Sequence, residues 1–329
     1  MRFGEKVSVD IFGASHSEQL DVILKGIPKG HAVSFDRILQ FMARRAPGKD
    51  PYSTPRLEKD FPVITSGIEN GITTGNDIIA YIKNENKRST DYSSIRYTPR
   101  PGHADYTAYL KYGKDYDPTG GGAFSGRMTA PLCFAGAVCI QILAESGVEI
   151  SAKPIMIGGV WGDEVAMKER ILQAKAKGDS VGGIVQCTVK GFKGGIGGPM
   201  WDGIESKISS AMFGIPAVKG VQFGSGFDGA AMTGSENNDP FIFKDGKIQT
   251  ETNNCGGILG GISTGGDIVF TVAFKPTPSI SATQSSVDLQ TCEQVQISVP
   301  GRHDPCVVLR AVPCVEASCA IALLDMLYI

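Results

Sequence analysis

Two segments far apart in the chain have nearly the same sequence. Residues 67–78 read GIENGITTGNDI and residues 257–268 read GILGGISTGGDI, with eight of twelve positions identical at a constant separation of 190 residues. A β-like run continues each segment, IIAYIKN for the first and VFTVAFKP for the second. Identical residues in register are better explained by an internal duplication than by chance similarity of two glycine-rich hairpins. The repeat therefore predicts two similar halves related by a pseudo-two-fold axis, with their glycine-rich turns near a shared site.

Two long apolar segments lie at the ends of these halves. Residues 128–145 and 312–327 are nearly apolar on every face of a helix, and each carries a proline near its start. A helix without a polar face is buried on all sides, and proline is tolerated in a first turn. The pattern predicts a layer of helices covered by sheets on both sides. At 329 residues the chain suits one large duplicated domain, with halves of about 1–150 and 151–329.

The remaining periodic segments predict shorter elements. Ser34 is a candidate N-cap, and Phe35, Ile38 and Met42 fall on one face of the helix that follows. This helix is expected to end near Arg45, before a Pro-Gly pair. Further helices are predicted over 163–177 and 200–213, strands over 182–190 and 217–223, an exposed loop or hairpin over 228–247, and an ordered arm or a mobile loop over 281–299.

The stretch from Thr98 to Arg127 gathers chemically active side chains around glycine. It contains Arg100, His103, Asp105 and Lys111. Glycine at 120–122 leaves backbone N–H groups uncovered and permits a close approach to a ligand. A rigid bend carrying His103 beside Arg100 would place a proton donor next to an anion. The alternative is a surface loop in which His103 hydrogen-bonds a carbonyl, and this stretch alone does not choose between the two.

Three of the four histidines lie in glycine- or proline-rich turns beside Ser, Asp or Arg. They are His16, His103 and His303, whereas His31 lies outside such a turn and is interpreted as structural. An imidazole gives or takes a proton near neutral pH. The spacing of these histidines does not demand a metal ion.

The arginines at turns and helix ends have a similar distribution. They are Arg45, Arg100, Arg127, Arg302 and Arg310. A guanidinium fork binds phosphate and carboxylate at two points, so the set would suit a small substrate with several negative groups. The alternative is a set of surface ion pairs, worth about 0–1 kcal/mol each.

Two glycine- or proline-rich strings suggest phosphate recognition. Residues 275–279, KPTPS, follow a predicted buried strand and offer one cation and two hydroxyls, which suits a phosphate site. Residues 121–128 superficially resemble a P-loop, but Arg127 and Met128 occupy the positions of the required Lys and Ser/Thr. Hydrolysis of a nucleoside triphosphate is therefore not expected.

Charge and cysteine usage exclude several classes of protein. The net charge of −2 gives no basic field for nucleic acid or an anionic membrane. The eight cysteines are scattered singly, without a CxxC pair that would suggest zinc. The N-terminus reads as a strand rather than a secretory signal, and we expect no apolar run long enough to span a bilayer. These features predict a cytoplasmic, reduced protein.

The motifs together resemble one family, chorismate synthase. In order along nearly the whole chain they are GASHS, ARRAPG, SGIENGITTG, NENKRSTDYS, RPGHAD, KYG, GGILGGIS, KPTPSI and GRHDPCVVLRAVPCVEA. The resemblance implies an α+β fold, a β–α–β sandwich with internal pseudo-symmetry in which antiparallel sheets flank the buried helices, assembled as a homotetramer. It implies a lyase of the shikimate pathway, which serves aromatic amino acid biosynthesis. Such an enzyme binds reduced FMN and converts 5-enolpyruvylshikimate 3-phosphate to chorismate by anti-1,4-elimination of phosphate.

The same resemblance implies roles for individual residues. His16 and His103 correspond to the two catalytic imidazoles, one beside the flavin and one beside the leaving phosphate, and Asp304 corresponds to the carboxylate that works near flavin N5. The implied substrate ligands are Ser15, Arg45, Arg100 and Arg127. The implied cofactor contacts are Arg45 (also a position associated with NADPH), Ala123, Phe124, Ser125, Ala217, Gly260, Lys275, Pro276, Thr277, Pro278, Ser279 and Arg302. No flavin-reductase domain is evident, so we expect reduced flavin to come from elsewhere, through a separate reductase or with NADPH as the source of electrons.

The chain departs from the family pattern around the implied flavin site. Ala123, Phe124 and Met128 replace an Arg, a Ser and a Glu of the family. Pro51 stands where an NADPH-associated arginine is common, and Pro216 where an Asn usually meets the flavin. Two hypotheses follow: a working chorismate synthase with altered flavin contacts, or a flavin-impaired, non-catalytic paralogue that binds an anionic metabolite or a partner.

Overall fold

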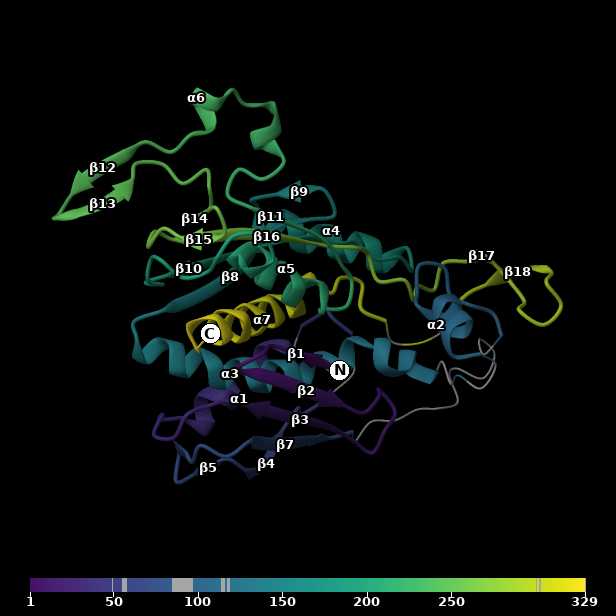
Figure 1. The fold of residues 1–329 in the computed structure, drawn as a ribbon. Coiled ribbons are helices and arrows are strands. Elements are labelled where there is room, and N and C mark those ends of the chain that lie inside the picture. Colours follow the sequence, from purple (N-terminus) through teal and green to yellow (C-terminus); the bar gives the residue numbers. More distant parts are fainter. Residues whose placement is uncertain are drawn as a thin grey trace.

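The computed structural model describes residues 1–48, 50–54, 58–84, 97–113, 116, 119–299, 301 and 303–328. Within these residues two five-stranded antiparallel sheets enclose a layer of helices, as Figure 1 shows. The predicted α+β class, with central helices flanked by antiparallel sheets, is confirmed. Arg302 and most of the NENKRSTDYS motif lie outside the described residues.

The first sheet is built from the N-terminal half of the chain. Its strand order is β1 (Arg2–Phe3), β2 (Ser8–Phe12), β3 (Gln19–Lys25), β7 (Ile78–Lys83) and β4 (Pro62–Ser66). Leu20, Val22 and Leu24 of β3 are fully buried because alternate side chains of a strand point to the same face. Helix α1 (Phe35–Arg45) follows β3, and its predicted cap is confirmed because the Ser34 side chain accepts a hydrogen bond from the amide of Arg37.

The second sheet is built from the C-terminal half. Its strand order is β11 (Val218–Phe223), β16 (Ile268–Phe274), β10 (Gly183–Lys190), β8 (Glu149–Ile157) and β9 (Val160–Trp161). The helices α4 (Glu164–Ala176) and α5 (Ile204–Phe213) confirm two further predictions. A 3-10 turn, η4 (Met200–Asp202), precedes α5, so this helix begins four residues later than predicted.

The two sheets have the same connectivity. Across the first sheet the order is β2, β3, β7, β4, and across the second it is β8, β10, β16, β11. In each sheet the last of these four strands in the chain lies between the second and the third. The repeated segments form matching hairpins, β5 (Ile68–Glu69) with β6 (Ile72–Thr73) and β14 (Ile258–Leu259) with β15 (Ile262–Ser263). The amide of Thr74 donates to the Gly67 carbonyl at 3.0 Å, and that of Thr264 to the Gly257 carbonyl at 2.9 Å. We infer one domain built from two related halves, about residues 1–150 and 151–329.

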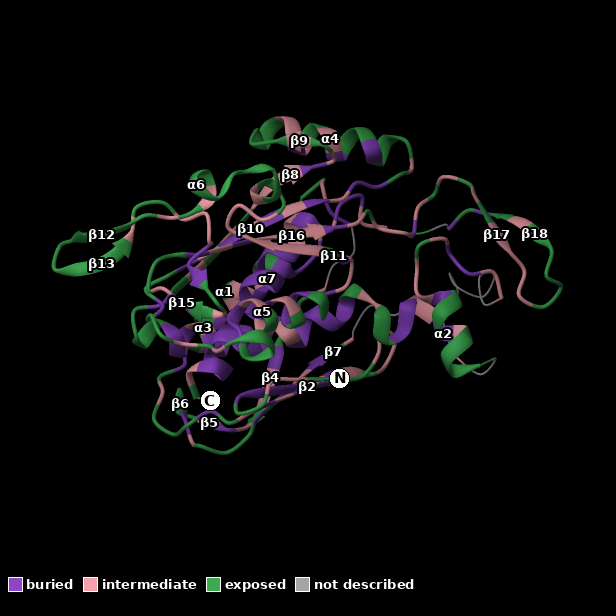
Figure 2. Ribbon diagram, turned by 45° about the horizontal axis from the view of Figure 1, so that its top comes forward, coloured by how far each residue is buried: buried purple, intermediate pink, exposed green. Residues whose placement is uncertain are grey.

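The helices α3 (Thr129–Glu145) and α7 (Val308–Tyr328) form the centre of the molecule and are largely buried, as Figure 2 shows. By length and composition, segments 126–145 and 308–328 could each cross a membrane, which corrects the expectation that no apolar run is long enough. They are 78% and 89% buried inside the protein, and buried core helices meet the same criterion. Helix α7 also begins four residues earlier than predicted, so Pro313 lies inside the helix rather than in its first turn.

Two arms project from the sandwich. One carries η5 (Asp228–Ala231), α6 (Gly234–Asn237) and the hairpin of β12 (Phe241–Lys244) and β13 (Lys247–Thr250), which Figure 2 shows as mostly exposed. The other is the hairpin of β17 (Gln284–Val287) and β18 (Gln294–Ile297), so residues 281–299 form an ordered arm. Figure 1 places β17 and β18 on the same side of the molecule as α2 (Asp105–Tyr112), near the segment that carries the predicted histidine bend.

Candidate active site

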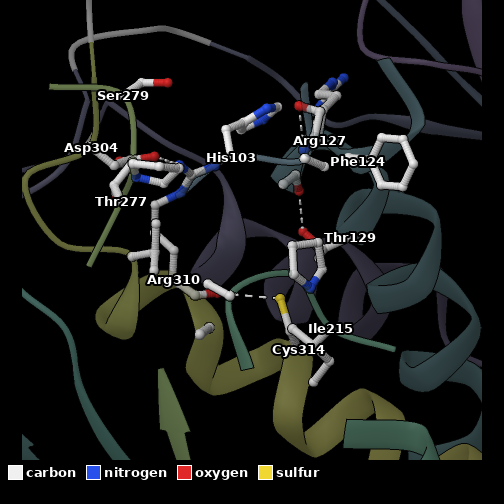
Figure 3. A pocket seen from close by; sticks show the side chains of 18 of the residues that line it. His103, Phe124, Arg127, Thr129, Ile215, Thr277, Ser279, Asp304, Arg310 and Cys314 are labelled. Atoms are coloured by element: carbon white, nitrogen blue, oxygen red, sulfur yellow. Dashed lines mark hydrogen bonds and ion pairs between the residues drawn. The ribbon is translucent and has the colours of Figure 1, made fainter. Parts of the chain in front are cut away.

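A cavity of about 640 Å³ is lined by segments from both halves of the chain. The N-terminal half contributes residues between 45 and 58 and between 100 and 129, and the C-terminal half contributes residues 213–217, 275–279 and 303–314. Figure 3 shows side chains from these segments facing a common space. Segments from both halves therefore meet at one cavity, although the described residues that line it include none from the repeats at 67–78 and 257–268, whose glycine-rich turns were expected near a shared site.

His103 lies on the wall of this cavity and is held by a carboxylate. Its Nδ1 atom is 2.6 Å from Oδ1 of Asp105. Nη2 of Arg100, which can only donate, lies 3.1 Å from the same atom. The shorter contact is to the carboxylate, which can only accept, and we therefore assign the hydrogen to Nδ1. The other ring nitrogen, Nε2, then faces the glycine loop, where a Cβ atom on Gly121 would lie 3.2 Å from it. The imidazole is thus oriented to exchange a proton through Nε2 on the glycine-loop side.

Arg100 binds the same carboxylate and links it to the second half of the chain. Its Nε and Nη2 atoms donate to the two carboxylate oxygens of Asp105 at 2.7 and 2.8 Å, and Nη1 donates to Oγ of Ser279 at 3.0 Å. Burial opposes the charge of Asp105, but hydrogen bonds from Arg100 and His103 outweigh it and hold the pKa of this carboxyl below its usual range. The histidine bend is therefore fixed against residues 275–279.

Arg45 and Arg127 meet at a second buried carboxylate, Asp60. Arg45, at the end of α1, donates from Nε to Oδ2 of Asp60 at 3.0 Å, and Arg127 donates from Nη1 to Oδ1. Glu58 adds a second negative charge, 2.8 Å from Nη1 of Arg127. Burial raises the pKa of Asp60, but the charges of Arg45 and Arg127 outweigh burial and lower it. Two guanidinium groups are thus held side by side by two carboxylates.

Asp304 lies on the cavity wall with Arg310 from the first turn of α7. Nη1 of Arg310 donates to Oδ2 of Asp304 at 2.5 Å, and the amide of Thr54 donates to Oδ1 at 2.9 Å. Nε of Arg310 donates to the carbonyl of Arg45 at 3.0 Å. The carboxylate is consequently held by contacts to both halves of the chain.

The glycine loop separates the two predicted catalytic histidines. Gly120, Gly121 and Gly122 have φ angles of +61°, +83° and +53°, a region that favours glycine. A Cβ atom on Gly120 would lie 2.1 Å from Cε1 of His16, so residue 120 contacts one imidazole and residue 121 the other. His16 is not among the described residues that line the cavity. It packs directly behind Gly120, and Gly120 does line the cavity.

Residues 275–279 form the wall beside His103. Nζ of Lys275 donates to the Gly102 carbonyl at 2.9 Å. Burial, and then the charge of Lys219, lowers the pKa of Lys275, so a bound anion would favour its charged form. The Thr277 hydroxyl oxygen is buried and has no hydrogen-bond partner among the described residues. A cation and an unsatisfied hydroxyl on one wall are suited to an anionic group.

Most of the implied site residues line the cavity. They are Arg45, Arg100, His103, Ala123, Phe124, Ser125, Arg127, Ala217, Lys275, Thr277, Pro278, Ser279 and Asp304. Ser15, Pro276 and Gly260 are not among the described lining residues, although the hydroxyl of Ser15 lies 3.0 Å from Nδ1 of His16. Gly260 lies in the turn between β14 and β15. Arg302 lies outside the described residues.

Two of the carboxylates that pair with the arginines, Glu58 and Asp60, were absent from the predicted residues, whereas Asp105 and Asp304 had been named without their arginine partners. Arg45 and Arg127 pair with Asp60 and Glu58, Arg100 with Asp105, and Arg310 with Asp304. Each of these four arginines is therefore paired with a carboxylate. The alternative of surface ion pairs is wrong for Arg45, Arg100 and Arg127, because all three are buried. The sequence around Glu58 and Asp60 does not distinguish them from acidic residues that lie on the surface.

Buried arginine forks, an oriented imidazole and a glycine loop around one space define an enzyme that acts on a small anionic molecule. Comparison with known proteins specifies which enzyme family. The sequence profile of the family described as "Chorismate synthase" matches residues 7–328. The chain belongs to the chorismate synthase family.

Individual relatives support this membership over the full chain. The chorismate synthase of Lancefieldella parvula is 42% identical over 99% of this chain and 96% of its own length. The chorismate synthase of Thermococcus kodakarensis is 43% identical over 98% of this chain and 96% of its own. A crystal structure of chorismate synthase superimposes with a TM-score of 0.77 at 27% identity, covering 98% of this chain and 92% of that one.

Proposed function

We propose that this protein makes chorismate from 5-enolpyruvylshikimate 3-phosphate by anti-1,4-elimination of phosphate, with reduced FMN as cofactor, in aromatic amino acid biosynthesis. The observation that carries the proposal is the oriented pair of His103 and Asp105, 2.6 Å apart, on the wall of a cavity that three buried arginines also line. Full-length similarity to chorismate synthases supports the same reaction.

The residues of the cavity fit an FMN molecule. Lys275 and the Thr277 hydroxyl, which no described residue contacts through a hydrogen bond, would bind its anionic or carbonyl oxygens, and Phe124 offers an aromatic face. Ala217, at a φ of +73°, presents backbone rather than a long side chain to the same space. When bound, reduced FMN would supply a transient electron that makes loss of phosphate feasible, since the C–H bond to be broken is not acidic.

The substrate carries two carboxylates and a phosphate, and the arginines would hold it in place. Because Arg45, Arg100 and Arg127 are already fixed by carboxylates, their guanidinium groups are preoriented and would lose little entropy on binding. Their pairing also compensates the positive charge of these three guanidinium groups. Binding and leaving-group stabilisation would then come from directed hydrogen bonds more than from net positive charge.

The two imidazoles would handle protons on opposite sides of the glycine loop. Arg100 and Lys275 tie the His103 bend to the 275–279 wall, so His103 would exchange a proton through Nε2 on the flavin side. His16, behind Gly120 and hydrogen-bonded to Ser15, would deliver a proton to the leaving phosphate. Asp304, held by Arg310 and Thr54, would work near the flavin as a proton acceptor.

Assembly and location belong to the same proposal. We infer a homotetramer, which the exposed Phe241, Phe243 and Ile248 of the β12–β13 arm support, since they are 68%, 77% and 73% exposed. We place the enzyme in the cytoplasm, where its eight free cysteines would stay reduced. Reduced flavin would come from a separate reductase, with NADPH only as the source of electrons.

An anaerobic assay tests the reaction. Purified protein with reduced FMN and the phosphate substrate should release phosphate and chorismate in equal amounts, followed by chorismate absorbance and phosphate detection. Folded protein that gives no product at saturating flavin would contradict the proposal. If that protein still bound the substrate, the result would support the alternative hypothesis of a flavin-impaired, non-catalytic paralogue.

A further inference from the structure

Two cysteines meet at the floor of the cavity, where the mechanism makes no use of them. The thiol of Cys133 in α3 donates to Sγ of Cys314 in α7 over a distance of 3.7 Å. Cys314 lines the cavity, and its own thiol contacts the carbonyl of Arg310 at 3.4 Å, the contact drawn in Figure 3. Cys133 lies behind it and is fully buried. Cys314 is itself buried, at 3% exposure, but it lines the cavity, whereas Cys133 is not among the described lining residues.

The backbones of α3 and α7 approach each other closely beside this pair. One turn further along both helices, a Cβ atom on Gly136 would lie 2.2 Å from Cβ of Ala317. Only glycine at 136 permits this approach. A disulfide requires close backbones, because its Cα atoms are about 4.4–6.8 Å apart and its sulfurs about 2 Å apart. The packing at Gly136 supplies this proximity for Cys133 and Cys314.

The surroundings make Cys314 the more acidic thiol of the two. The hydrogen bond from Cys133 lowers the pKa of Cys314, and the charges of Arg45 and Arg310 act in the same direction against burial. Burial raises the pKa of Cys133 well above its usual range. The sulfur that faces the cavity is therefore the better nucleophile at neutral pH, and the sheltered one is positioned to resolve its oxidised form.

We propose that Cys133 and Cys314 form a peroxide-sensitive dithiol that opens on the cavity. The Cys314 sulfur attacks one oxygen of hydrogen peroxide, the O–O bond breaks, and sulfenic acid and water form. The Cys133 sulfur then attacks the Cys314 sulfur and displaces a second water, which leaves a disulfide between α3 and α7. Two thiols and one peroxide thus give one disulfide and two waters. The proposal does not rest on the reaction assigned to the cavity.

A second thiol pair offers a control within the same molecule. Cys187 and Cys319 are also fully buried, and burial, and then the neighbouring Cys319, raises the pKa of Cys187 well above its usual range. Neither is among the described residues that line the cavity. If proximity of two thiols were sufficient for oxidation, both pairs would react. If access from the cavity is required, only Cys133 and Cys314 should react.

The test is a peptide map of the full chain after brief exposure to hydrogen peroxide, catalase quenching, and alkylation in denaturant. Two of the eight thiols should be lost, with Cys133 and Cys314 joined in one peptide pair that dithiothreitol separates. The thiols of Cys187 and Cys319 should remain free. The oxidised chain should also melt at a higher temperature than the reduced chain, because the cross-link joins distant parts of the sequence.

Two variants separate the steps. In Cys133→Ser the oxidised Cys314 has no resolving thiol, so dimedone should label it as sulfenic acid, whereas Cys314→Ser should leave Cys133 unreactive. If either variant fails to fold, the map of the unmodified chain still decides. The proposal would be overturned if the thiols of Cys133 and Cys314 stayed reduced at a peroxide dose that oxidises the exposed Cys292. It would also be overturned if Cys187 and Cys319 were oxidised to the same extent as Cys133 and Cys314.

Discussion

The Nδ1 atom of His103 lies 2.6 Å from a carboxylate oxygen of Asp105, and the same carboxylate accepts two hydrogen bonds from the guanidinium of Arg100. One buried carboxylate thereby fixes both a proton carrier and an anion ligand. Asp105 follows His103 by two residues at the start of α2, so the short RPGHAD segment contains the whole arrangement. Asp105 is a positioning residue whose effect reaches the substrate through His103.

Asp105→Asn is expected to reduce turnover by about 10²-fold or more, because an amide can donate to Nδ1 as well as accept from it and so no longer fixes the hydrogen there. Anaerobic chorismate formation measures the rate, and ¹⁵N chemical shifts of His103 report its tautomer. The exposed Asp245→Asn in the β12–β13 turn removes one carboxylate elsewhere and should leave both readouts unchanged. A wild-type rate in the Asp105 variant, with the tautomer altered, would show that the orientation of His103 is irrelevant to catalysis.

Asp60→Asn is expected to destabilise the fold by about 3–5 kcal/mol, because it removes the carboxylate shared by the buried Arg45 and Arg127. Urea unfolding of the ligand-free protein measures this loss. The matched change Glu58→Gln should cost less, because Glu58 is more exposed than Asp60, 14% against 1%. Equal effects of the two changes would mean that Asp60 is not the principal partner.

The same carboxylate predicts how stability depends on pH. Arg45 and Arg127 make Asp60 more acidic in the folded chain than in the unfolded chain. Its stabilising contribution is therefore fully present above the unfolded pKa of about 3.9, and it is lost as the pH falls through the lower folded-state value. Unfolding free energies of wild type and Asp60→Asn should accordingly converge below about pH 4. A difference between them that stays constant down to acid unfolding would contradict this assignment.

Sequence reasoning predicted the architecture where a local pattern reports a global property. The repeat at 67–78 and 257–268 indicated two matching hairpins, and the all-apolar segments indicated helices between two sheets. It misjudged the start of α7, because Pro313 suggested a first turn, whereas the apolar residues before it extend the helix to Val308. Burial of these apolar residues in the core thus outweighs the low helix propensity of Pro313 inside α7.

The candidate site was predictable only in part for a similar reason. Arginine and histidine in glycine-rich turns are uncommon enough to be noticed, and most of those predicted do line the cavity. Their counter-charges were not predictable, because Glu58 and Asp60 resemble any exposed acidic residues until the fold buries them. The position of His16 behind Gly120 likewise depends on a contact between residues 104 positions apart.

Gly120→Ala is expected to lower both stability and turnover. The left-handed φ of +61° costs about 1–2 kcal/mol for any other residue, and the new Cβ would lie 2.1 Å from the His16 ring. Displacing that ring by about 1 Å should cost about 10²-fold in rate. The control is Gly147→Ala, which has a φ of +76° and no atom within 4 Å of its Cβ, so it should lose stability but keep its rate. Equal rates in the two variants would remove His16 from the mechanism.

Ala123→Arg is expected to tighten FMN binding by about tenfold, because residue 123 is exposed at the cavity lining and a guanidinium there adds a charge-assisted hydrogen bond to an anion. Quenching of flavin fluorescence measures the affinity. Ala123→Gln lengthens the side chain without adding charge and should give little or no gain. Equal tightening by both changes would assign the effect to contact area rather than to charge.

Thr277→Val separates stability from binding at a single atom. The Thr277 hydroxyl oxygen is buried without a hydrogen-bond partner among the described residues, so the free protein gains nothing from it. Replacing it by a methyl group should leave the free energy of unfolding unchanged or slightly higher.

Bound FMN, in contrast, would lose a hydrogen bond to this hydroxyl, and its affinity should fall by about 5- to 10-fold, or about 1 kcal/mol. The comparison variant is Thr54→Val, which also replaces a hydroxyl at the cavity by a methyl group but keeps the backbone hydrogen bond from residue 54 to Asp304. A Thr277 variant that unfolds more easily but binds FMN normally would mean that the hydroxyl supports the fold and does not face the ligand. If residues 275–279 bind the ligand, the variant should instead keep its stability and bind FMN more weakly, because the buried Thr277 hydroxyl would gain its hydrogen-bond partner only when the ligand is bound.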